Sequence, residues 1–121
     1  MTKNSSVIAR ARYSLAGVKI ALRQERSLRT HVAASLVIFA ALAWDGADAF
    51  WWAVLILAVV AGWAFEIANA AIETLCDKLH PCRDPMIGQV KDLASAAAFV
   101  VNMAIVVLIG IYLISRASLA S

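Results

Sequence analysis

Apolar residues dominate three long segments of the chain, and polar residues gather before and between them. The apolar segments cover residues 28–45, 49–75 and 91–115, and each can form a helix that crosses the hydrocarbon core of a bilayer. The first is the shortest, with an uncharged run of about 15 residues, so its flanking residues must help it to reach both interfaces. A loop at residues 76–90 contains both prolines of the chain and a glycine. The pattern therefore predicts three transmembrane helices.

A different pattern marks residues 5–27, where basic side chains alternate with apolar ones. Apolar residues recur there every three or four positions: Ile8, Ala11, Leu15, Val18 and Leu22. A helix with this spacing lies in the headgroup region with its apolar face toward the lipid. We therefore expect an amphipathic surface helix. Glu25 is the single acid in the first 29 residues, which carry seven Lys and Arg residues. A salt bridge to Arg29, four residues on, is the structural alternative to a functional role.

Composition and charge place this chain in a membrane. It has 121 residues, is 63% hydrophobic and has a mean hydropathy of +0.80, whereas soluble domains are about 45–50% apolar. Ten of its eleven Lys and Arg residues lie before the first span or around the second loop. The positive-inside rule then predicts a cytoplasmic N-terminus and an external C-terminus. We expect no cleaved leader.

Three helices enclose little interior, so we also expect a homo-oligomer.

Within the second span, four polar residues share one helical stripe. Glu66, Asn69, Glu73 and Asp77 follow one another at steps of three, four and four residues. An ionised group at mid-bilayer costs about 2.5–3.5 kcal/mol, and neighbouring carboxylates repel unless a cation joins them. Because this span runs toward the cytoplasm, Glu66 lies about 10 Å deeper than Glu73. The shallow acids are suited to Mg²⁺ with nucleotide phosphates, and Glu66 is suited to the polar end of a lipid.

The third span begins with a second polar group. Lys91 can neutralise phosphate charge, and Asp92 is either part of a site or an acid that favours the start of a helix. Ser95 and Asn102 are expected to form hydrogen bonds between helices.

Other chemistries fit poorly. The chain has no phosphate-binding loop and no Gly-x-Ser-x-Gly motif, so any nucleotide site is unconventional. Cys76, His80 and Cys82 lack the paired spacing of zinc ligands, and two cysteines on the reducing side do not predict a disulfide. His31 is interpreted as a polar residue at the membrane interface.

These residues resemble the small bacterial membrane lipid kinases, which comprise diacylglycerol kinase and undecaprenol kinase. The family pattern Glu-x-x-Asn-Ser/Thr-Ala-Ile-Glu-x-x-x-Asp, followed after a loop by Lys-Asp, is matched by Glu66, Asn69, Ala71-Ile72-Glu73, Asp77 and Lys91-Asp92. The chain departs from it at Ala70, where the family usually has a small hydroxyl residue. Tyr13-Ser14, Gly17 and residues 25–29 also look like the family's surface helix. The resemblance implies an all-α homotrimeric bundle in the bacterial inner membrane, with active sites shared between subunits at the cytoplasmic surface.

The resemblance also implies an activity and a role for each matching residue. MgATP would phosphorylate the primary hydroxyl of diacylglycerol to give phosphatidic acid, with Glu66 as general base and Glu25 and Glu73 holding Mg²⁺. The residues implied to bind the nucleotide are Tyr13, Gly17, Glu25, Asn69, Glu73, Asp77, Lys91 and Asp92. The residues implied to bind the lipid are Ser14, Glu66 and Ser95.

Three alternatives remain at this stage. Undecaprenol could replace diacylglycerol, because both lipids present a primary hydroxyl at the same depth. A small multidrug transporter also uses an intramembrane acid, but it would have four spans and an acid in the first. A nonenzymatic membrane subunit would have no use for Glu25 or the Lys91-Asp92 pair. No nucleic-acid partner is expected.

Overall fold

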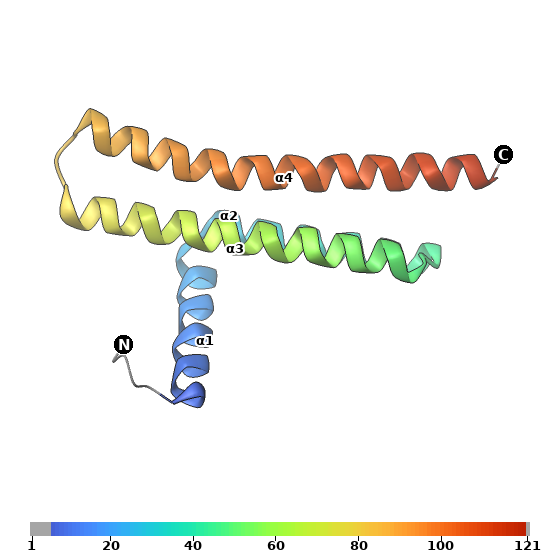
Figure 1. The fold of residues 1–121 in the computed structure, drawn as a ribbon, viewed down its shortest axis with the longest axis horizontal. Coiled ribbons are helices and arrows are strands. Elements are labelled where there is room, and N and C mark those ends of the chain that lie inside the picture. The colour runs from blue at the N-terminus through green and yellow to red at the C-terminus, as the bar shows by residue number, and fades with distance from the viewer. Residues whose placement is uncertain (1–5, 121) are drawn as a thin grey trace.

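The computed structural model describes residues 6–120, and the side chains as far as residue 118. These residues form four helices: α1 (Val7–Gln24), α2 (Arg26–Asp45), α3 (Ala49–Leu79) and α4 (Pro85–Ala120). Helices α2, α3 and α4 run alongside one another, and α1 projects away from them at a steep angle (Figure 1). Each of α2, α3 and α4 is long and apolar enough to cross a membrane. The all-α fold with three transmembrane helices is therefore confirmed, while the trimer stays a prediction.

The surface helix ends one turn earlier than the predicted boundary at residue 27. Glu25 has an extended backbone, with φ −95° and ψ 111°, and separates α1 from α2. The Arg29 guanidinium donates to the carbonyls of Leu22 and Arg23, at 3.2 and 3.0 Å, and so satisfies the open end of α1. The predicted start at residue 5 lies outside the described residues, as does Lys3.

The same break lengthens the first span. Helix α2 begins at Arg26 and has 20 residues, which correspond to about 30 Å at 1.5 Å per residue. That length matches the hydrocarbon core of a typical bilayer. The uncharged run of about 15 residues is too short to span the bilayer alone, and the polar first turn of α2 supplies the remaining length.

A tight turn joins α2 to α3. Gly46 has the left-handed backbone conformation, with φ 65° and ψ 40°, which a glycine adopts without strain. Two residues later, the Asp48 side chain accepts a hydrogen bond of 3.2 Å from the Trp51 amide and caps the start of α3. The two helices are thus antiparallel neighbours.

The loop between α3 and α4 is shorter than the predicted segment of residues 76–90. Helix α3 continues to Leu79, and α4 already begins at Pro85. The Asp84 carboxylate accepts from the amides of Met86 and Ile87, at 2.7 and 3.2 Å. Proline directly after such a cap is favourable at the first helical position, because its missing N–H would have no partner there. Pro85 therefore starts a helix.

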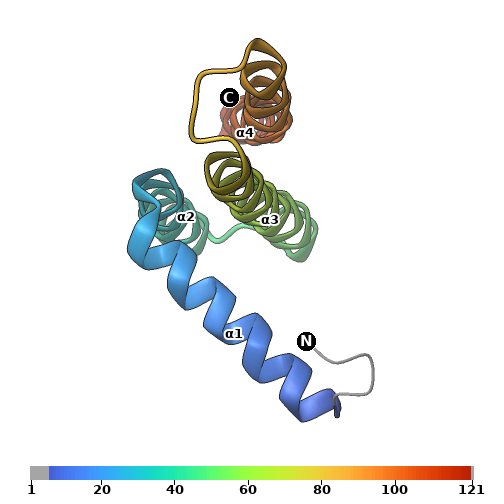
Figure 2. The ribbon, with the colours of Figure 1, turned by 90° about the vertical axis from the view of Figure 1, so that its left-hand side faces the viewer.

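Helix α3 packs against both α2 and α4 (Figure 2). A cluster of buried residues lies at the end of the bundle away from α1 and contains Leu42, Leu55 and Tyr112, with Trp51 edge-on to Tyr112. Nearby, the Arg116 Nε atom lies 2.6 Å from Asp45 Oδ2, and the Tyr112 hydroxyl donates to the same oxygen. These contacts join the α2–α3 turn to α4.

Many large apolar side chains of the bundle remain exposed in the single chain. Examples are Trp44, which is 94% exposed, Leu57, Leu93 and Ile114. In an aqueous domain such a surface would be unusual, but lipid or neighbouring subunits cover it in a membrane. At the other end, the α3–α4 hairpin continues past the junction of α1 and α2 (Figure 1).

Candidate active site

Glu66, near the middle of α3, is held by side chains from two other helices. Its Oε2 atom accepts a hydrogen bond of 2.9 Å from the Ser27 hydroxyl of α2. Its Oε1 atom accepts one of 2.9 Å from Asn102 Nδ2 of α4 and lies 3.1 Å from His31 Nε2 of α2. The Glu66 side chain is only 11% exposed. Such a carboxylate requires these partners, because an unpaired buried charge is costly.

One turn closer to the α3–α4 loop, Asn69 and Glu73 form a second polar pair. Asn69 Nδ2 donates to Glu73 Oε1 at 3.1 Å, whereas the buried Asn69 Oδ1 has no protein partner. Both side chains line a cavity of about 360 Å³ that also receives Glu25, Glu66 and the hydroxyl-bearing Ser95. Three carboxylates therefore line one space between the helices.

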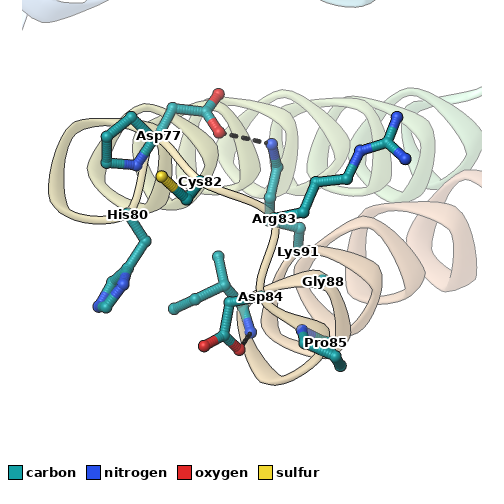
Figure 3. Close-up of a pocket in the computed structure, with 10 residues that line it drawn as sticks. Asp77, His80, Cys82, Arg83, Asp84, Pro85, Gly88 and Lys91 are labelled. Atoms are coloured by element: carbon teal, nitrogen blue, oxygen red, sulfur yellow. Dashed lines mark hydrogen bonds and ion pairs between the residues drawn. The ribbon is translucent and has the colours of Figure 1, made fainter.

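Asp77 and Lys91 lie at a different place, where α3 ends and α4 begins. Lys91 Nζ donates to Asp77 Oδ1 at 2.8 Å, and the pair lines a cavity of about 520 Å³ beside the loop (Figure 3). His80 and Arg83 also line this cavity. Because Asp77 is 67% exposed, the pair is open to solvent rather than buried between helices.

The structure brings together part of the predicted site. Five predicted residues line the cavity at Glu66: Glu25, Glu66, Asn69, Glu73 and Ser95. The remaining predicted residues lie elsewhere in the single chain: Tyr13, Ser14, Gly17, Asp77, Lys91 and Asp92. Gly17 lines a separate depression between α1 and α3 that includes Glu25 on its rim.

The other distant residues are exposed. Tyr13 lies on α1 against Arg12, the Ser14 hydroxyl donates to its own helix at Arg10 O, and Asp92 is exposed on α4. The salt-bridge alternative for Glu25 is wrong, because Arg29 instead binds the end of α1 and Glu25 has no ion pair within residues 6–118.

Two partners of Glu66 were not predicted from the sequence: Ser27 was not considered, and His31 was interpreted as an interfacial residue. The expectation that Asn102 forms hydrogen bonds between helices is confirmed, although Glu66 was not named as its partner. For Asn102 a signal was present, because it lies ten and seven residues after Asp92 and Ser95 and so shares their side of α4. For Ser27 and His31 the signal is their four-residue spacing on α2, which places them on one face.

Gly62 fixes how closely α3 and α4 approach at this site. A Cβ atom there would lie 3.1 Å from Ile105 Cδ1 and 3.2 Å from Asn102 Oδ1. Small residues at such positions let transmembrane helices come close together. The absence of a side chain at Gly62 therefore allows Asn102 to reach Glu66.

The fold and the site define a small integral membrane protein whose three spans surround a cluster of acids and amides. Comparison with known proteins agrees with this class. Residues 12–114 match the model of the family described as prokaryotic diacylglycerol kinase. A diacylglycerol kinase of Escherichia coli K12 is 31% identical over 94 residues, which cover 78% of this chain and 77% of the relative. One from Haemophilus influenzae is 28% identical over 94 residues, covering 78% of this chain and 80% of the relative.

The chain therefore belongs to the prokaryotic diacylglycerol kinase family, and the resemblance noted in its sequence is confirmed. It is a membrane-embedded lipid kinase. The transporter and the nonenzymatic subunit are set aside by this membership.

Proposed function

We propose that this protein transfers the γ-phosphoryl group of ATP to the primary hydroxyl of diacylglycerol, giving phosphatidic acid. The observation that carries the proposal is the nearly buried Glu66 carboxylate, which three side chains hold at a cavity shared with Glu25 and Glu73. The names of the relatives favour diacylglycerol over undecaprenol.

Glu66 acts as the general base. When the lipid hydroxyl attacks the γ-phosphorus, its proton passes to Glu66, and the electron pair of the broken O–H bond forms the new O–P bond. The bond between the γ-phosphorus and the bridging oxygen breaks, and its electrons remain on ADP. Ser27 and Asn102 orient the carboxylate, so that little reorganisation is needed at the moment of transfer.

The donor atoms around the cavity fit Mg²⁺. Glu25 and Glu73 line the cavity and supply hard oxygen donors, which this ion prefers. Within the described residues no group of three His, Cys, Asp or Glu side chains is placed to hold a metal ion. Mg²⁺ that arrives with a nucleotide usually takes only one or two protein carboxylates, and phosphates and water are its other ligands. Bound Mg²⁺ would neutralise charge on the phosphates.

Chelation tests this part of the proposal. We expect EDTA to abolish phosphoryl transfer and added Mg²⁺ to restore it, and Glu73→Gln to raise the Mg²⁺ concentration needed for half-maximal rate. Activity that persists unchanged in EDTA would exclude the metal.

The Asp77–Lys91 pair at the hairpin end is proposed to bind the nucleotide, with Lys91 attracting the phosphates. Tyr13, Gly17 and Asp92 are proposed to extend this nucleotide site, and Ser14 and Ser95 to border the lipid. The concentration of Lys and Arg at this end supports its placement on the cytoplasmic side of the inner membrane, with the C-terminus outside.

A homotrimer with shared sites is proposed for the working enzyme. In its favour, the exposed apolar surface of the bundle needs a cover, and Asp92 and Tyr13 lie apart from the Glu66 cavity in one chain. A neighbouring subunit can bring these residues to the site, whereas one chain leaves them on its surface. Cross-linking in detergent should yield dimers and trimers, and a strictly monomeric active protein would refute this part.

The central experiment measures transfer from labelled ATP to two lipids. Purified protein in mixed micelles receives diacylglycerol or undecaprenol, and kcat/KM is compared. We expect a clear preference for diacylglycerol, and a preference for undecaprenol would replace our substrate. Glu66→Gln keeps the shape of the side chain and should lower kcat by about a hundredfold or more, as expected for loss of a general base. Asp48→Asn is the matched control, because an amide still caps α3 at the opposite end.

A further inference from the structure

His31 and Asn102 both contact the same carboxylate oxygen of Glu66. Its Nε2 atom lies 3.1 Å from Glu66 Oε1, and Asn102 Nδ2 lies 2.9 Å from that oxygen and 3.3 Å from the ring nitrogen. In the single chain the His31 side chain is 32% exposed and that of Glu66 is 11% exposed. The imidazole is therefore in direct contact with the carboxylate and is the more exposed of the two groups.

The packing around His31 holds the ring in place. The Ser35 hydroxyl, which is buried, donates to the His31 carbonyl at 2.6 Å and accepts a hydrogen bond of 3.1 Å from Trp63 Nε1 on α3. A cavity of about 310 Å³ beside the ring is lined mainly by apolar residues of the three spans. On α3, the titratable group that faces His31 is Glu66. On α4, the group that faces His31 is the neutral amide of Asn102. Within the described part of the chain no other charged group contacts His31.

A base that is used once per turnover must lose its proton before the next. Each transfer to a lipid hydroxyl leaves one proton on Glu66, and the His31 ring nitrogen lies 3.1 Å from the Oε1 atom that can carry this proton. An unprotonated imidazole nitrogen can accept a proton from a neighbouring carboxyl group and pass it on.

We propose that His31 is a positioning residue that also removes this proton, taking it from Glu66 Oε1 onto an unprotonated Nε2 and releasing it to water. This inference rests on the proposed role of Glu66 and assigns to the same site a group that restores the base. In the step, the Oε1–H bond breaks as the Nε2–H bond forms, and the carboxylate returns to its charged form. The imidazolium then gives a proton to water, which matches the one proton that phosphorylation of an alcohol by ATP releases.

The structure predicts what each substitution at position 31 does. Glutamine places an amide group near the position of Nε2, so His31→Gln keeps a polar contact with Glu66 but cannot take up its proton. Alanine removes both functions and leaves space at a partly exposed position. We therefore expect His31→Gln to lower kcat by about tenfold or more near neutral pH, with KM for ATP and for the lipid unchanged.

The test is the pH profile of kcat for the full-length enzyme and three variants. In the wild type, kcat should fall as acid protonates the ring, and His31→Gln should lose this limb. Imidazole added to the buffer should restore part of the rate of His31→Ala and none of that of Glu66→Gln. Binding of ATP and the oligomeric state in detergent are measured for every variant, to show that the protein is intact.

Each outcome decides the proposal. A His31→Gln enzyme with a wild-type rate and pH profile overturns it. A uniform loss at every pH, with no rescue of His31→Ala, would make His31 a purely structural partner of Glu66 and also overturn the proton transfer. If the wild type phosphorylates no lipid, the proposed function itself fails, and if Glu66→Gln is fully active, the base assignment fails.

Discussion

Asn102 offers the sharpest test of the site, because its amide joins α4 to both Glu66 and His31. Replacing it with alanine removes a donor 2.9 Å from Glu66 Oε1 and 3.3 Å from His31 Nε2. A hydrogen bond to a charged partner contributes about 1.5–3 kcal/mol. Since each 1.4 kcal/mol or so changes a rate tenfold, we expect kcat of Asn102→Ala to fall about ten- to a hundredfold.

The loss should be smaller than that of Glu66→Gln, because Ser27 still holds the other carboxylate oxygen at 2.9 Å. The assay is steady-state transfer from labelled ATP to diacylglycerol in mixed micelles, with unfolding by SDS measured in parallel. Val107→Ala is the matched control, since it truncates an exposed side chain on the same helix. If Asn102→Ala retains half or more of the wild-type kcat, the amide does not orient Glu66 and our account of the base is refuted.

Further substitutions test the contacts that position the site. Gly62→Ala should force Asn102 to shift by a few tenths of an ångström, which costs about 1–3 kcal/mol of stability and slows transfer several-fold, as measured by SDS unfolding and kcat. An unchanged protein would mean that the helices separate freely there. Tyr112→Phe removes a donor to Asp45 at the far end, so SDS should unfold it more easily while kcat stays unchanged, and a lower kcat would contradict this separation. Asp84→Ala removes the cap of α4 and should cost about 1 kcal/mol in the same unfolding assay, whereas Asp84→Asn should be close to wild type.

The helical fold and the number of spans were predictable, because a bilayer permits few backbone structures to cross it. A run of apolar residues must satisfy its backbone hydrogen bonds internally, so residues 49–75 and 91–115 read directly as helices. Boundaries were less predictable. Pro85 reads as a helix breaker in isolation, and only its position directly after the Asp84 cap makes it a helix start.

The acids of the site were predictable from local spacing alone. Glu66, Asn69 and Glu73 lie on one stripe of one helix, and a stripe needs no knowledge of tertiary structure. The partners of these residues on other helices were not predictable. Periodicity shows which residues share a face of one helix, but it does not show which faces of two helices pack together. His31 and Ser27 are 35 and 39 residues from Glu66 in the chain, so no local pattern joins them to it.

By itself, the sequence determined that this chain spans a membrane three times and carries a line of acids and an amide in its second span, because hydropathy and helical periodicity are local properties. Only the tertiary structure decided that Glu66 is bound by Ser27, His31 and Asn102, while Asp77 and Lys91 pair at the solvent-exposed end of the hairpin. The reason is physical. The approach of α4 to α3 at Gly62, and the packing of α2 beside them, set which side chains meet, and such distances between helices have no counterpart in residue spacing along one helix.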